Sequence, residues 1–184
     1  VDFSNAIYDY ECKLLSQAAN CPIHLAAMKF SAEAIIEQYP LDTMQPGDVY
    51  VLNDPYKGGT HINDITFLSP IFFEGDIIAF AVSRGHWMDL GGGAAGGQAF
   101  GGTHIAGEGL RLPPLKLYEA GKVREDLLAI IMNNTRTPFY VKGDTQAHVG
   151  ALKAATQEME RAAEKYGMAT LKAAMKQLQE YTER

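Results

Sequence analysis

The spacing of apolar residues changes along the chain, and each change marks a different kind of predicted element. Short apolar stretches separated by turn residues predict strands at residues 5–9 and 13–16. Residues 25–39 instead carry apolar side chains three and four positions apart, which predicts a helix that ends before Pro40. The first part of the chain is therefore expected to contain two strands and one helix.

The middle of the chain returns to short apolar runs bounded by turn residues. These runs predict strands at residues 48–52, 65–68, 71–73 and 77–83. Glu74-Gly75-Asp76 lies between the last two runs and predicts a tight turn. The strands on either side of this turn are therefore expected to pair with each other.

Helical spacing returns in the last third of the chain. It predicts helices at residues 125–133, 146–166 and 168–181, with Gly167 ending the second of them. Before them lies a glycine-rich tract, Gly91 to Gly109, whose glycines are too dense for a regular helix or strand. We expect it to form a loop.

Strands that come first and helices that come last predict an α+β fold rather than a doubly wound parallel sheet. The strand-rich region, with the glycine-rich loop and the candidate metal site described below, spans residues 1–123. The helical region spans residues 124–184. Both are interpreted as parts of one domain.

The composition is that of a folded protein. Hydrophobic residues make up 47% of the 184 residues and charged residues 21%, which allows a packed core. The net charge of −6 and the lack of a basic run argue against a nucleic-acid partner. The apolar runs are too short to span a bilayer, so no membrane partner is expected. Cys12 and Cys21 do not form a Cys-x-x-Cys pair, and we interpret them as reduced thiols of a cytoplasmic protein.

Two His-x-x-Asp motifs carry the strongest chemical signal. His61 and Asp64 form the first, and His86 and Asp89 form the second at the same offset of 25 residues (86 − 61 and 89 − 64). Each motif lies at the end of a predicted strand. If these strands are neighbours, the two imidazoles and two carboxylates converge on one point.

Two imidazoles with two carboxylates, and no thiolate, suit Mn²⁺, Fe²⁺ or Zn²⁺ better than Ca²⁺. Four protein ligands leave a position for substrate only when the metal accepts a fifth or sixth ligand. The alternative interpretation is that each histidine simply forms a structural hydrogen bond with a nearby carboxylate.

Further candidates lie outside these motifs. Glu108, between two glycines, is a candidate general acid or base, or else a plain exposed glutamate. Asp54 either caps a turn, is a further metal ligand, or accepts a hydrogen bond from one of the ligands. His104 lies in Gly101-Gly102-Thr103-His104-Ile105, which repeats residues 58–62 without the aspartate, and is at most a substrate-side residue. No phosphate-binding glycine motif is present, so ATP binding by this chain is not expected.

A series of short motifs follows in a fixed order along the chain. They are Asn53-Asp54-Pro55-Tyr56, Gly58-Gly59-Thr60-His61 with Asp64, Arg84 with His86, Asp89 with Gly91-Gly92, the run from Glu108 to Pro114, Asn134 with Arg136, and Gly143-Asp144. Together they resemble the B-type subunits of the hydantoinase B/oxoprolinase family, nearly from end to end. Subunits of that family are much longer than 184 residues, so the chain is expected to be a fragment of one.

The resemblance implies a division of work between two subunits of a hetero-oligomer. An A-type partner binds ATP and phosphorylates the small-molecule substrate, while the B-type subunit holds a divalent metal and completes the reaction. The ligands that it implies here are His61, Asp64, His86 and Asp89. We expect Mn²⁺ or Zn²⁺, with Fe²⁺ as a further candidate.

Three hypotheses for function follow. The first is a metal-binding subunit for ATP-dependent opening of a cyclic amide such as hydantoin, 5-oxoproline or a lactam. The second is a subunit of an ATP-dependent ketone carboxylase of the acetone or acetophenone type, in which Arg84 is a candidate catalytic residue that offsets anionic charge. The third is a non-catalytic assembly module with a structural metal.

Overall fold

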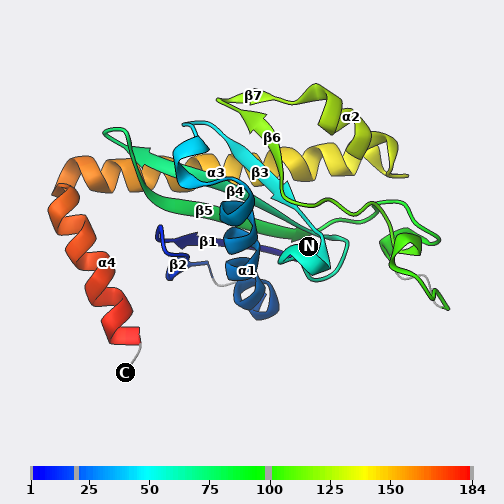
Figure 1. Cartoon of the computed structure of the whole chain (residues 1–184), viewed down its shortest axis with the longest axis horizontal. Coiled ribbons are helices and arrows are strands. Elements are labelled where there is room, and N and C mark those ends of the chain that lie inside the picture. The colour runs from blue at the N-terminus through cyan, green and yellow to red at the C-terminus, as the bar shows by residue number, and fades with distance from the viewer. Residues whose placement is uncertain (1, 19–20, 98–100, 183–184) are drawn as a thin grey trace.

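The computed structural model describes residues 2–18, 21–97 and 101–182. These residues form a seven-stranded, fully antiparallel sheet with helices on both faces (Figure 1). The strand order is β2-β1-β5-β4-β3-β6-β7. The predicted α+β class is confirmed. The strands are β1 (Phe3–Tyr8), β2 (Leu14–Gln17), β3 (Val49–Leu52), β4 (Asp64–Phe73), β5 (Asp76–His86), β6 (Leu115–Glu119) and β7 (Lys122–Val123).

Helices cover the two faces of the sheet and bury both. They are α1 (Pro22–Gln38), α2 (Glu125–Asn133) and α3 (Pro138–Tyr166). The last helix, α4 (Met168–Thr182), extends from the end of α3 and contacts the sheet mainly at the edge strand β2 (Figure 1). Leu68 and Phe80 pack with α1, whereas Phe67 and Ala81 pack with α2 and α3 on the opposite face. Neighbouring residues of a strand point to opposite faces. The central strands are therefore apolar at successive positions, which explains why they appear in the sequence as continuous apolar runs.

Strand β4 is longer than predicted. The sequence predicts two strands broken at Pro70, but the structure has one continuous strand from Asp64 to Phe73. Proline has no N–H to donate and is normally excluded from a central strand. Here β3 pairs with β4 only as far as Leu68, and Pro70 pairs with Phe80 of β5 on the other side. Pro70 therefore lies where one edge of β4 has no strand partner.

Other boundaries also differ from the prediction. The β6–β7 pair was not predicted, and α3 begins at Pro138 rather than at residue 146. The buried positions of its first turns are Val141, Thr145 and His148, and two of these are polar. No apolar stripe therefore marks these turns in the sequence. Among the described residues, no helix combines the length and the apolar character needed to cross a membrane.

The described parts of the glycine-rich tract form short turns, η3 (Ala95–Gly97) and η4 (Ile105–Gly107), rather than long regular elements. Residues 98–100 of the tract lie outside the described residues. Gly91 and Gly92 have positive φ, and a Cβ at Gly92 would lie 2.6 Å from the carbonyl oxygen of Gly107. The two halves of the tract therefore approach each other backbone to backbone.

Candidate metal centre

The candidate centre lies at one end of the β4–β5 pair. Asp64 is the first residue of β4 and His86 the last residue of β5, and the two are direct partners in the strand register. His61 precedes β4 by one short turn, in which the backbone N–H of Asp64 donates to the carbonyl oxygen of His61. The antiparallel pairing thus brings together residues that are 22 positions apart.

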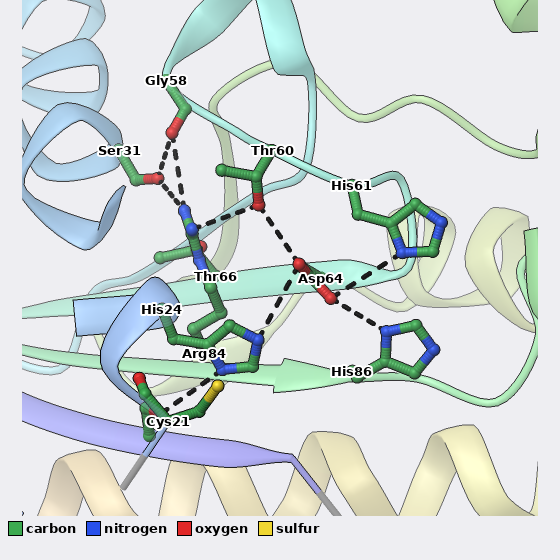
Figure 2. A network of polar contacts seen from close by, with 11 residues as sticks. Cys21, His24, Ser31, Gly58, Thr60, His61, Asp64, Thr66, Arg84 and His86 are labelled. Carbon is green, nitrogen blue, oxygen red and sulfur yellow. Dashed lines mark hydrogen bonds and ion pairs between the residues drawn. The ribbon is translucent and has the colours of Figure 1, made fainter. Parts of the chain in front are cut away.

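Three side chains converge there (Figure 2). Nδ1 of His86 lies 2.9 Å from Oδ1 of Asp64, and Nδ1 of His61 lies 3.9 Å from the same oxygen. The two imidazole rings are nearly parallel, with centroids 5.2 Å apart and an interplanar angle of 14°. One ligand atom of each residue lies within 4.8 Å of the others.

This group fits a divalent metal. Two neutral imidazoles and one carboxylate are the donor set of many open transition-metal sites, and three protein ligands leave positions for substrate. The side chains of His61 and His86 are 33% and 36% exposed. The group therefore opens to one side, whereas a structural site is normally closed by four protein ligands.

The electrostatics favour an ionised carboxylate at the centre. Burial alone raises the pKa of Asp64, but the hydrogen bond with His86 and the charges of the surrounding histidines lower it below its usual value. The same hydrogen bond raises the pKa of His86. Asp64 is thus held in the charged form that binds a cation.

The second oxygen of Asp64 is held from the protein side. The hydroxyl of Thr60 donates to Oδ2 over 3.2 Å, and the guanidinium of Arg84 donates to the Thr60 hydroxyl over 3.3 Å. Oδ1 of Asp64 remains directed at His61 and His86 (Figure 2).

Arg84 is fully buried, and burial lowers its pKa to about 10. Its guanidinium also donates to Thr66 over 2.7 Å, to Ser31 of α1 over 2.6 Å and to the carbonyl oxygen of Gly58 over 3.5 Å. The sequence suggested Arg84 as a catalytic residue. In this structure its guanidinium is buried, and its hydrogen-bonded link to Asp64 runs through the Thr60 hydroxyl.

A glycine allows the loop before His61 to approach α1. Gly58 has φ of +84°, and a Cβ there would lie 2.3 Å from the carbonyl oxygen of Phe30. The carbonyl oxygen of Gly58 accepts a hydrogen bond from the Ser31 hydroxyl over 2.6 Å. This contact fixes the segment that carries Thr60 and His61.

Sequence reasoning missed His24. It lies in the first turn of α1, and its Nε2 is 3.8 Å from Oδ2 of Asp64, opposite the other two histidines (Figure 2). Its Nδ1 lies 3.3 Å from the Ser4 hydroxyl, and burial lowers its pKa. No His-x-x-Asp spacing marks it, because only the packing of α1 on the sheet brings it to Asp64.

The structure does not bring Asp89 to this group, in contrast to the four-ligand expectation. Its buried carboxylate accepts a hydrogen bond from the backbone N–H of Arg136 over 2.5 Å and pairs with the Arg136 guanidinium at 3.0 Å. Thr135 donates to its backbone oxygen over 2.8 Å. The chain leaves the sheet after His86, so the side chain of Asp89 no longer follows the strand register.

The other candidates lie apart from the centre. Asp54 caps the short turn η2 (Pro55–Lys57) by accepting from the N–H of Tyr56 over 3.0 Å. His104 is exposed and accepts from the N–H of Ala106 over 3.1 Å. Glu108 is half-buried, and its N–H donates to Ile105 at the end of η4. Among the described contacts, no hydrogen bond or ion pair joins the Glu108 side chain to the centre.

Comparison with known proteins identifies the family. The profile described as hydantoinase B/oxoprolinase matches residues 1–184. The chain belongs to this family. It is 36% identical over 169 residues to an uncharacterized protein of Methanocaldococcus jannaschii, covering 91% of this chain and 30% of that protein. It is 32% identical over 183 residues to the beta subunit of the caprolactamase of Pseudomonas jessenii, covering all of this chain and 31% of that relative.

Solved structures share the fold of this family member. The crystal structure of the ATP-dependent caprolactamase from Pseudomonas jessenii superposes with a TM-score of 0.87 at 30% identity, covering 96% of this chain and 30% of that chain. An acetone carboxylase structure gives a TM-score of 0.82 at 20% identity, covering 92% and 22%, which is a likeness of fold. The chain spans less than a third of the length of these relatives.

Proposed function

We propose that this chain forms the metal-binding part of an ATP-dependent hydrolase of cyclic amides such as hydantoin, 5-oxoproline or a lactam. The observation that carries the proposal is the convergence of His61, Asp64 and His86 at the open end of the β4–β5 pair. The names of relatives support the class of reaction. They include the beta subunit of a caprolactamase and a putative B-type subunit of a D-/L-hydantoinase from a Pseudomonas strain, the latter 33% identical over 144 residues.

In this proposal each residue has a defined role. His61, Asp64 and His86 hold a divalent cation, with Mn²⁺ or Zn²⁺ the best fit and Fe²⁺ also suited to the donors. When bound, the cation supplies Lewis-acid polarisation of the substrate's carbonyl oxygen. Arg84 and Thr60 orient Asp64. Glu108 remains our candidate for moving a proton to or from the substrate.

We place ATP on a separate A-type subunit. This chain lacks a phosphate-binding glycine motif. Two relatives are named as the beta or B-type member of an enzyme with more than one kind of subunit, which supports a hetero-oligomer. The substrate then reaches this centre after activation by the partner.

The test uses the complete B-type subunit with its A-type partner. We expect the wild-type complex to contain the metal by elemental analysis and to consume ATP when a cyclic amide is added. The double variant His61→Ala/Asp64→Ala should lose both properties. Metal content and turnover that survive in this variant would refute the proposed centre.

The same assay separates the alternatives. ATP consumption that requires bicarbonate and a ketone would assign the chain to a carboxylase instead. Metal that is retained without any substrate-stimulated ATP consumption would favour a structural role. The partial exposure of both imidazoles favours the catalytic interpretation.

A further inference from the structure

Asn63 lies between His61 and Asp64 in the sequence and is fully buried. Its side-chain Nδ2 donates to the carbonyl oxygen of Trp87 over 2.7 Å. Its backbone oxygen accepts from the N–H of Trp87 over 2.8 Å. Since a carbonyl oxygen can only accept, the first contact determines which side-chain atom is nitrogen. The orientation of the amide is therefore settled.

The other side-chain atom, Oδ1, is buried and has no hydrogen-bond partner among the described residues. It faces Gly97 of the glycine-rich tract. A Cβ built on Gly97 would lie 2.2 Å from Oδ1 of Asn63 and 3.2 Å from Nε2 of His61. The amide oxygen of Asn63 and the outer nitrogen of His61 therefore both lie close to this one position, which glycine leaves free of a side chain.

The nitrogen of His61 that points to Asp64 is Nδ1. If Nδ1 binds a metal, Nε2 must carry the ring proton, because a neutral imidazole has one donor and one acceptor nitrogen. Histidines that bind metals almost always donate this second N–H to a protein acceptor, which fixes the ring. Oδ1 of Asn63 is an acceptor near the same Gly97 position, and it has no hydrogen-bond partner among the described residues.

We infer that Asn63 is a positioning residue for His61, whose Nε2 proton its side-chain oxygen accepts when Nδ1 holds the metal. This inference rests on the proposed metal centre. A buried acceptor without a partner is unfavourable, so formation of this contact favours the bound state. Asn63 also donates to Trp87, the neighbour of His86, and thus joins the two histidine-bearing segments.

Gly97 keeps the space between the two groups open. Its φ of +64° and its contact with Asn63 both disfavour any side chain at this position. Gly96 has a similar φ of +78°, but a Cβ there would meet no atom within 4 Å. An alanine at either glycine would strain the backbone, but only an alanine at Gly97 would also contact Asn63. Comparing the two substitutions therefore distinguishes backbone strain from the loss of this space.

The first experiment compares Asn63→Leu with Asn63→Asp by titrating the metal-free, complete B-type subunit with Mn²⁺ and with Zn²⁺. Both variants lose the donor to Trp87, but only Asn63→Asp keeps an acceptor. We expect Asn63→Leu to weaken metal affinity about 10- to 100-fold, and Asn63→Asp to bind within about threefold of wild type. An equal loss in both variants would show a merely structural role and overturn the inference.

The second comparison sets Gly97→Ala against Gly96→Ala in the same titration. We expect only Gly97→Ala to weaken binding, by about tenfold or more. Equal effects of the two substitutions would again overturn the inference. The metal centre itself would still be supported if the wild-type protein binds metal and His61→Ala does not. If the wild-type protein takes up neither metal, the proposed centre itself fails, and the role of Asn63 fails with it.

Discussion

Asp64 and His86 face each other across the β4–β5 pair, with Nδ1 of His86 2.9 Å from Oδ1 of Asp64. The two residues are direct partners in the register, so one hairpin builds two of the three candidate ligands. A shift of the register by one residue would turn one of them to the other face of the sheet. The geometry of the centre is thus tied to the register of β4 and β5, the longest strand pairing among the described residues.

Replacing Asp64 by asparagine keeps the shape of the side chain but removes its charge. We expect Asp64→Asn to weaken Mn²⁺ or Zn²⁺ binding by more than about 100-fold, since even an outer partner of a ligand contributes roughly 10- to 100-fold. Isothermal titration calorimetry measures this loss. Asp76→Asn, at the exposed start of β5, is the control and should bind like wild type. Unchanged binding in Asp64→Asn would exclude the carboxylate as a ligand.

Asp89→Asn tests the residue that the sequence placed in the site and the structure placed elsewhere. The variant weakens the buried contacts of this carboxylate with Arg136. We expect the free energy of unfolding to fall by about 1–3 kcal/mol while metal affinity stays unchanged. Urea unfolding and metal titration measure the two effects. An unchanged free energy of unfolding together with loss of metal binding would instead show that Asp89 is a metal ligand.

Thr60→Val removes the hydroxyl that links Arg84 to Asp64. Thr60 is exposed, so the fold should lose little stability. We expect metal affinity to fall about tenfold, because Asp64 loses a donor that orients it. Thr103→Val is a matched control, since Thr103 holds the same place in the repeated Gly-Gly-Thr-His-Ile sequence. If the two variants bind the metal with equal affinity, the hydrogen-bonded link from Arg84 through Thr60 to Asp64 has no role in metal binding.

His148 makes the stability of the fold depend on pH. It is fully buried, and burial lowers its pKa to about 3. Trp87 donates to its Nε2 over 3.3 Å, so Nδ1 carries the proton and faces the Ser83 hydroxyl at 2.9 Å. The rings of Phe3 and Phe67 stack on it, with centroids 4.2 and 4.3 Å away.

The sign of the pH effect follows from the lowered pKa. The unfolded chain binds a proton below about pH 6.5 and the folded chain does not. As the pH is lowered from about 6.5, the free energy of unfolding should therefore decrease, by up to about 1.4 kcal/mol per pH unit. His148→Gln should have a shallower dependence between pH 7 and pH 5 in urea unfolding. Parallel dependences would mean that His148 titrates in the fold.

The sequence predicted the fold class well where local pattern and tertiary packing agree. The α1 and α2 segments have clear apolar spacing, and the turn at Glu74-Gly75 marks the β4–β5 hairpin. It failed at Pro70, because whether a proline breaks a strand depends on which neighbours pair with it. It also failed at the start of α3, where Thr145 and His148 are buried but polar, so no apolar spacing marks the first turns.

Residue types and spacing alone determined that His61, Asp64 and His86 are candidate ligands, because two His-x-x-Asp motifs flank strands that a tight turn joins. Only the tertiary structure decided the rest. In the folded chain, Asp89 pairs with Arg136 and His24 of α1 lies near Asp64. Arg84 is buried and donates a hydrogen bond to Thr60. The physical reason is that the register of a strand determines which way a side chain points only for residues within the strand. Beyond the last paired residue, the packing of distant helices and loops determines where a carboxylate points.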